Sequence, residues 1–158
     1  MRYYIETQRT AHHEAFHAVM ACYEGGPKAV RYVQADGGEG LCAYKPGLSI
    51  ESQRRITKAP MHGLNASHGF RTPGYSGDRE QYLELLRLSG NKGRDEYDLL
   101  ASPDAQSDDL AIDDMRTYFS PLIQKLALAI ARCGQLTGDT VEAYYCNYLR
   151  EHPHLQRS

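Results

Sequence analysis

The chain has 158 residues, a length typical of one domain with a sizeable hydrophobic core. Hydrophobic residues make up 41% and charged residues 24%, as in ordinary globular proteins, and the net charge of −2 argues against a nucleic-acid or anionic-membrane partner. No apolar run approaches the roughly 20 residues that a membrane-spanning helix needs, so we expect no membrane partner either.

The N-terminus and the cysteines indicate a cellular compartment. Residues 1–7 lack the pattern of a signal peptide. The four cysteines, Cys22, Cys42, Cys133 and Cys146, are scattered and form no Cys-x-x-Cys pair. We therefore expect reduced thiols in a cytoplasmic protein, and neither a disulfide framework nor a cysteine zinc site.

The first predicted element is a helix over about residues 6–23, which Gly25-Gly26-Pro27 ends. It contains the His-Glu-x-x-His pattern as His13-Glu14-Ala15-Phe16-His17. Helical positions four apart share a face, so the two imidazoles can bind one metal ion at about 2.0–2.1 Å each. Glu14 is turned by about 100° from His13 and can reach a water molecule on the metal as a general base. The pattern predicts a zinc site, and the alternative is a pair of histidines that face solvent or are satisfied in the core.

The rest of the chain is predicted to be mainly helical, with one β-hairpin. Val30, Tyr32 and Val33 favour a strand over residues 29–35, and the glycine-rich turn 36–40 leads to a returning strand over 41–44. A helix is predicted through 53–58, which Pro60 kinks or ends, with a further turn to 66, and a loop follows over 67–77. A helix over 78–88 comes next, and then an irregular stretch over 90–106. The last predicted elements are a helix over 107–119, a restart at Ser120-Pro121 that continues to 131, and a final helix with a capping box at 139–142. We expect one domain over residues 1–150 and a frayed tail over 151–158.

Residues 10–21, Thr-Ala-His-His-Glu-Ala-Phe-His-Ala-Val-Met-Ala, resemble the T-A-x-H-E-A-G-H-A-x-x-A segment of FtsH-type zinc peptidase domains. The order that follows is similar too, with a hairpin, a helix containing a proline, a variable stretch, and a helix that opens on an Asn-Asp-(Leu/Ile)-like tripeptide, here Asp108-Asp109-Leu110. Residues 136–143 are similar to the closing helix of small stand-alone relatives. The resemblance covers residues 8 to 150 and implies a zincin-like, mainly α fold with a small hairpin (α+β).

The resemblance implies three zinc ligands, His13, His17 and Asp109, with Glu14 as the base. A catalytic zinc keeps three protein ligands and an open position, so the two histidines do need a third partner. Asp109 has a structural alternative, because an acid in the first turn of a helix also stabilises the helix dipole. On that helix Asp109 and Asp113 share a face, whereas Asp108 points elsewhere. The other candidates for a third ligand are Asp113, His62, His68 and Glu39, and Asp108 and Asp114 compete at the same helix end.

Two departures from the family pattern bear on activity. Phe16 stands where the family has glycine, beside the metal face, where a ring either narrows the site or packs in the core. The chain has no phosphate-binding Gly-x-x-x-x-Gly-Lys-(Ser/Thr) motif and no membrane anchor, both of which the large family members carry. We expect an ATP-independent zinc metalloendopeptidase that cleaves peptides or unfolded chains. The alternative is a non-catalytic, metal-stabilised binding or regulatory module, and the sequence carries no signal for an oligomeric state.

Overall fold

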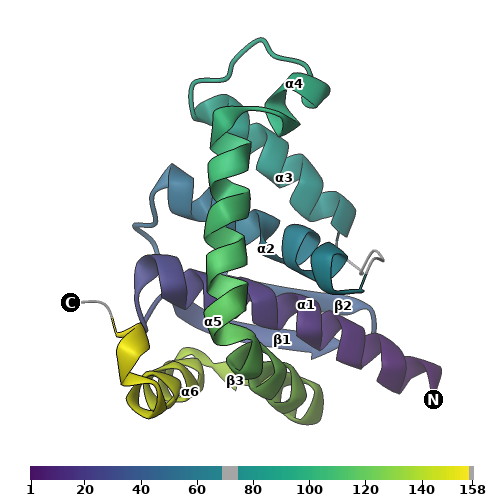
Figure 1. Ribbon diagram of the computed structural model, residues 1–158. Coiled ribbons are helices and arrows are strands. Elements are labelled where there is room, and N and C mark those ends of the chain that lie inside the picture. The colour runs from purple at the N-terminus through teal and green to yellow at the C-terminus, as the bar shows by residue number, and fades with distance from the viewer. Residues whose placement is uncertain (69–74, 157–158) are drawn as a thin grey trace.

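A computed structural model of the chain describes residues 1–68 and 75–156, with side chains over 1–64 and 77–156 (Figure 1). Its elements are α1 (Arg2–Gly25), β1 (Val30–Asp36), β2 (Glu39–Tyr44), α2 (Ile50–His68), α3 (Tyr75–Leu88), α4 (Glu96–Leu100), α5 (Pro103–Cys133), β3 (Gln135–Thr137), α6 (Gly138–Glu151) and a 3₁₀ helix (Pro153–Leu155). The predicted fold class, mainly α with a small antiparallel sheet, is confirmed. Among the described helices, none has the length and apolar character to cross a bilayer.

Helix α1 lies at the centre of the fold. It contacts α2 and α5 as well as the hairpin of β1 and β2 (Figure 1). All residues from 13 to 22 are buried, because helices and strands cover it on several sides. Ala11, Ala15, Ala18 and Ala21 are small and let those neighbours approach the helix closely. The helix is longer than the predicted 6–23, and the metal-binding pattern lies in its buried half.

The predicted hairpin is present and belongs to a three-stranded antiparallel sheet with the order β2-β1-β3. Asp36 pairs with Glu39 across a tight turn in which Gly37 has a φ of 58°. The third strand was not predicted, because its three residues lie between the end of α5 and the cap of α6 and have no alternating pattern. Within the described residues, strand β2 is an outer strand of this sheet and pairs with β1.

Two prolines do not interrupt their helices. Pro60 lies inside α2 and Pro121 lies inside α5. The predicted restart at Ser120-Pro121 is therefore wrong, and of the two outcomes predicted at Pro60, a kink or an end of the helix, the end is wrong. Ser120 does not act as a cap: its hydroxyl donates to the carbonyl of Arg116, one turn earlier in the same helix. Tertiary contacts of α2 and α5 with α1 hold both helices together across the missing hydrogen bond.

The stretch 90–106, predicted to be irregular, contains α4 and the start of α5. Asp95 caps α4 by accepting a hydrogen bond from the backbone of Asp98, and Ser102 caps α5 through the backbone of Ala105. Asp and Ser cap helices but are equally common in polar loops, so the sequence pattern alone did not distinguish these helix starts from a loop. Thr137 caps the N-terminus of α6, because its side chain accepts a hydrogen bond from the backbone of Thr140. After α6, a 3₁₀ helix is present where a frayed tail was expected.

The buried residues form two hydrophobic clusters. The larger one lies around α1 and includes residues of α2, α5, α6 and the sheet. The smaller one joins α3 and α4 to α2 and α5 through Met61, Tyr82, Leu83, Leu86, Leu99 and Ala105. Helix α3 therefore belongs to a different cluster from the helix that carries the histidine pair.

Candidate metal centre

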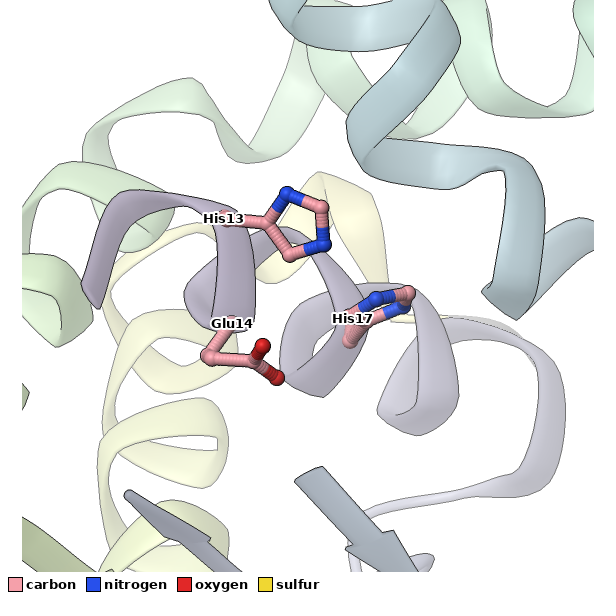
Figure 2. A group of neighbouring side chains, drawn as sticks. All are labelled: His13, Glu14 and His17. Carbon is pink, nitrogen blue, oxygen red and sulfur yellow. The ribbon is translucent and has the colours of Figure 1, made fainter. Parts of the chain in front are cut away.

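Helix α1 presents His13, Glu14 and His17 to the same side, as Figure 2 shows. Their side chains are buried, with 2%, 7% and 6% exposed, respectively. One ligand atom from each lies within 4.8 Å of the others, and the two imidazole centroids are 5.0 Å apart. The group can hold a metal ion, as the spacing of the histidines predicts.

Asp78 completes the arrangement from a second element. It lies in the first turn of α3, and its Oδ2 is 2.7 Å from His13 Nε2 and 3.0 Å from His17 Nε2. One carboxylate oxygen thus contacts the same nitrogen of both rings. Two histidines from one helix and an aspartate from another offer three donors that converge on one point.

The backbone of α2 fixes the orientation of the His17 ring. The ring Nδ1 lies 2.7 Å from the carbonyl oxygen of Ile56, which can only accept a hydrogen bond. Nδ1 must therefore carry a proton, and the neutral ring has its lone pair on Nε2, the nitrogen that faces Asp78. A hydrogen bond of this kind from the outer nitrogen is the usual support for a metal-binding histidine.

The charges of the three groups are coupled. Burial alone would raise the pKa of Asp78, but hydrogen bonds from His13 and His17 and the charge of the rings hold it at about 2. Burial disfavours the charged form of His17 too and by itself would lower the pKa of the ring. The hydrogen bond and the charge of Asp78 nevertheless raise the pKa of His17 above the ordinary value. The pKa of His13 is lowered, mainly by burial. In the metal-free protein the proton between His17 and Asp78 therefore occupies the place that a cation can take.

Glu14 lies beside the two rings and under the hairpin. Burial raises the pKa of its carboxyl group from 4.5 to about 7. Gly40 of β2 covers it so closely that a Cβ atom at that position would lie 2.8 Å from Glu14 Cγ and 2.9 Å from Glu14 Oε1. The hairpin turn is held there by Thr10, whose hydroxyl donates to the carbonyl of Gly37 over 2.7 Å. These contacts fix the carboxyl group next to the histidine pair.

Asp109, the predicted third ligand, is not brought together with the histidine pair. Its Oδ1 lies 2.6 Å from Lys58 Nζ and 3.4 Å from His62 Nδ1, both on α2. The aspartate within hydrogen-bond distance of both rings is Asp78. The two aspartates differ in the helix that each one faces. Asp109 contacts the cationic side chain of Lys58 on α2, whereas Asp78 of α3 contacts the histidines of α1.

The other candidate ligands have different surroundings. His62 Nε2 is 2.9 Å from Asp113 Oδ1, so these two residues pair with each other between α2 and α5. Asp108 is fully buried, and its carboxylate contacts Arg54 and Arg55 of α2. Glu39 and Asp114 are exposed, and the side chain of His68 lies outside the described residues.

Phe16 is a core residue. Its side chain is 3% exposed and belongs to the larger hydrophobic cluster. The ring packs against Gly63 of α2, where a Cβ atom would lie only 2.3 Å from Phe16 Cε1. A glycine on the facing helix thus makes the space that the ring at position 16 fills.

Sequence reasoning missed Asp78, although a signal was present. Asp78 follows Gly77 at the start of the helix predicted over 78–88, a position comparable to that of Asp109 in the helix predicted over 107–119, but the resemblance implied Asp109. The chain matches no protein-family model, and no match was found among curated proteins. The description of the centre therefore rests on the geometry of this chain.

Proposed function

We propose that the protein is a zincin-like, ATP-independent zinc metallopeptidase whose ligands are His13, His17 and Asp78. The observation that supports this is the single oxygen of Asp78 that lies 2.7 Å and 3.0 Å from the Nε2 atoms of the two histidines. Asp78 replaces Asp109 in the ligand set, and the positions of His13, His17 and Glu14 follow the sequence pattern.

The donor set fits zinc. Two imidazoles and one carboxylate, with a fourth position left open, are a ligand set found in zinc peptidases. The contacts of Asp78 Oδ2 with the two Nε2 atoms, 2.7 Å and 3.0 Å, bring the three groups close enough to share one ion, whose bonds to nitrogen and oxygen would be about 2.0–2.2 Å long. Three nitrogen and oxygen donors without a thiolate also separate this centre from the cysteine-rich structural zinc sites.

Glu14 is the proposed general base. A bound zinc ion would supply Lewis-acid activation of a water molecule and of the scissile carbonyl group. With such an ion bound, the Glu14 carboxylate would accept the proton of the attacking water and would pass it to the leaving amine. In the chain without a metal ion, burial raises the pKa of Glu14 to about 7.

The proposed substrate is an extended peptide or an unfolded chain. Strand β2 is an outer strand, and Gly40 in this strand lies directly over Glu14. A peptide that adds as a further strand to β2 is bound through its backbone and passes close to the base. Recognition of this kind needs little sequence specificity and no nucleotide. We place the protein in the cytoplasm, where its four free cysteines stay reduced.

The ligand assignment is tested by metal content. We expect about one zinc per chain in the wild type, a strong loss in Asp78→Ala, and no loss in Asp109→Ala. The two variants are matched, because each removes a carboxylate that pairs with a cationic or imidazole side chain. Zinc lost from Asp109→Ala and retained in Asp78→Ala would reverse the assignment.

The catalytic assignment is tested with an unfolded substrate. The wild type with zinc should cleave casein, and Glu14→Gln should keep the zinc and lose cleavage by roughly 10² or more. One feature favours a non-catalytic, metal-stabilised module as a second candidate: all three residues of α1 in the centre are nearly inaccessible to solvent. Zinc binding without any cleavage by the wild type would support that second candidate.

A further inference from the structure

A buried ionic network lies in the interface of α2, α3 and α5, away from the proposed ligands. Asp108 is at its centre and has no exposed surface. The guanidinium of Arg54 donates two hydrogen bonds to this carboxylate, from Nε over 2.9 Å and from Nη2 over 3.0 Å. Arg55 Nε is 3.2 Å from Asp108 Oδ1, and the hydroxyl of Tyr82 donates to Asp108 Oδ2 over 2.7 Å.

Tyr82 connects this network to the proposed metal centre through α3. It stands four residues after Asp78, so the two side chains lie on the same face of the helix, one turn apart. Tyr82 is fully buried, and burial followed by the charge of Asp108 raises its pKa, so its hydroxyl remains a hydrogen-bond donor. One turn of α3 is thereby anchored to α5, and the adjacent turn presents Asp78 to α1.

The anchor matters because α3 belongs to the smaller hydrophobic cluster. It packs against α2 and α4, while His13 and His17 belong to α1 in the larger cluster. The distance from Asp78 to the histidines is therefore set by how α3 is held on α2 and α5. The contacts of Arg54 also include Ser89 at the other end of α3, so the network fixes the helix at two places.

We infer that Tyr82, anchored on the Asp108–Arg54 pair, is a positioning residue that holds Asp78 at the distance from His13 and His17 which a shared metal ion requires. The inference rests on the proposed ligand set. It assigns the Tyr82 hydroxyl a role in metal affinity that goes beyond its contribution to packing, although it does not contact the metal-binding atoms.

The test is the zinc dissociation constant of Tyr82→Phe, measured by competition with a chromophoric chelator. Phenylalanine keeps the ring in the smaller cluster and removes only the hydroxyl. We expect zinc affinity to fall about tenfold, at the lower end of the losses that follow removal of outer supporting groups. The visible spectrum of the cobalt-substituted variant should change as well, because the third ligand is displaced.

Tyr148→Phe is the matched control. It removes a tyrosine hydroxyl of a buried residue, which donates to the carbonyl of Tyr118 over 2.6 Å between α6 and α5 in a part-buried hydrogen bond. This variant should lose stability and keep its zinc affinity and cobalt spectrum. Equal affinities in Tyr82→Phe and Tyr148→Phe would overturn the inference. A wild type that binds no zinc would instead overturn the proposed function, so the two failures are distinguishable.

A double-mutant cycle shows whether Tyr82 acts through Asp78. In an Asp78→Ala background, Tyr82→Phe should have no further effect on the residual zinc affinity, because the residue that it positions is gone. A tenfold loss that persists in this background would mean a general disturbance of α1 and would overturn the inference. If Tyr82→Phe does not fold, Arg54→Lys takes its place, since lysine keeps the charge and cannot form the two-pronged contact with Asp108.

Discussion

Replacing Glu14 by glutamine should raise the free energy of unfolding and abolish peptide cleavage. The gain in stability should depend on pH. In the metal-free protein burial raises the pKa of Glu14 from 4.5 to about 7. A carboxyl group whose pKa is higher in the folded chain than in the unfolded chain stabilises the fold while it is protonated. Its contribution is complete below about pH 4.5 and is lost as the pH rises through about 7.

The size of this effect follows from the shift. Each pKa unit corresponds to about 1.4 kcal/mol, so ionising the buried Glu14 costs the fold about 3 kcal/mol above pH 8. Glutamine has nearly the same shape and never ionises. Glu14→Gln should therefore be more stable than the wild type by up to about 3 kcal/mol at pH 8.5 and by no more than about 1 kcal/mol at pH 5.

The assay is urea unfolding of both proteins in the presence of a chelator, at pH 5 and at pH 8.5. The variant's advantage should appear as a higher midpoint at pH 8.5 with an unchanged slope. Thermal unfolding should agree, with a rise of several degrees at the higher pH. A variant that is no more stable than the wild type at pH 8.5, or equally stabilised at both pH values, would refute the reasoning that Glu14 is buried in its charged form.

Three further predictions concern the histidines and the two tight glycines. His13→Ala should abolish stoichiometric zinc binding, which elemental analysis measures, and a variant that keeps one tightly bound zinc would contradict the ligand set. Gly63→Ala should destabilise the protein by about 1–3 kcal/mol in urea unfolding, because the new methyl group overlaps the ring of Phe16, whereas helix propensity alone would stabilise it by about 1 kcal/mol. Gly40→Ala should leave zinc content unchanged and reduce casein cleavage, since the methyl group displaces Glu14 or the hairpin, and unchanged cleavage would show that Gly40 does not set the position of the base.

The local part of the centre could be predicted from the sequence, and the part that depends on packing could not. His13 and His17 lie four residues apart in a stretch of α1 that contains no glycine or proline before Gly25, so their common face follows from helix geometry. The third carboxylate lies on another helix, and Asp78 and Asp109 both stand near the start of a helix that the sequence predicts. In the structure Asp78 lies in the first turn of α3, whereas α5 begins at Pro103, six residues before Asp109. What separates them is the helix opposite each one, because Lys58 and His62 of α2 face Asp109.

The same distinction explains the errors in the elements. Pro60 and Pro121 are local signals for a break, but both lie in helices that pack along α1, and these tertiary contacts override the local preference. The short strand β3 exists because it pairs with the middle of β1, a contact about a hundred residues apart in sequence that no periodicity reveals. Phe16 shows the converse case, in which a departure from a family pattern is accommodated by a glycine on the facing helix.

The most direct test of the central claim is a crystal structure of the zinc-loaded protein with anomalous diffraction recorded at the zinc absorption edge. We expect one anomalous peak per chain, about 2.0–2.2 Å from His13 Nε2, His17 Nε2 and one carboxylate oxygen of Asp78. Asp109 should remain with Lys58 and His62. A zinc ion bound through Asp109, or no zinc between the two histidines, would contradict the account.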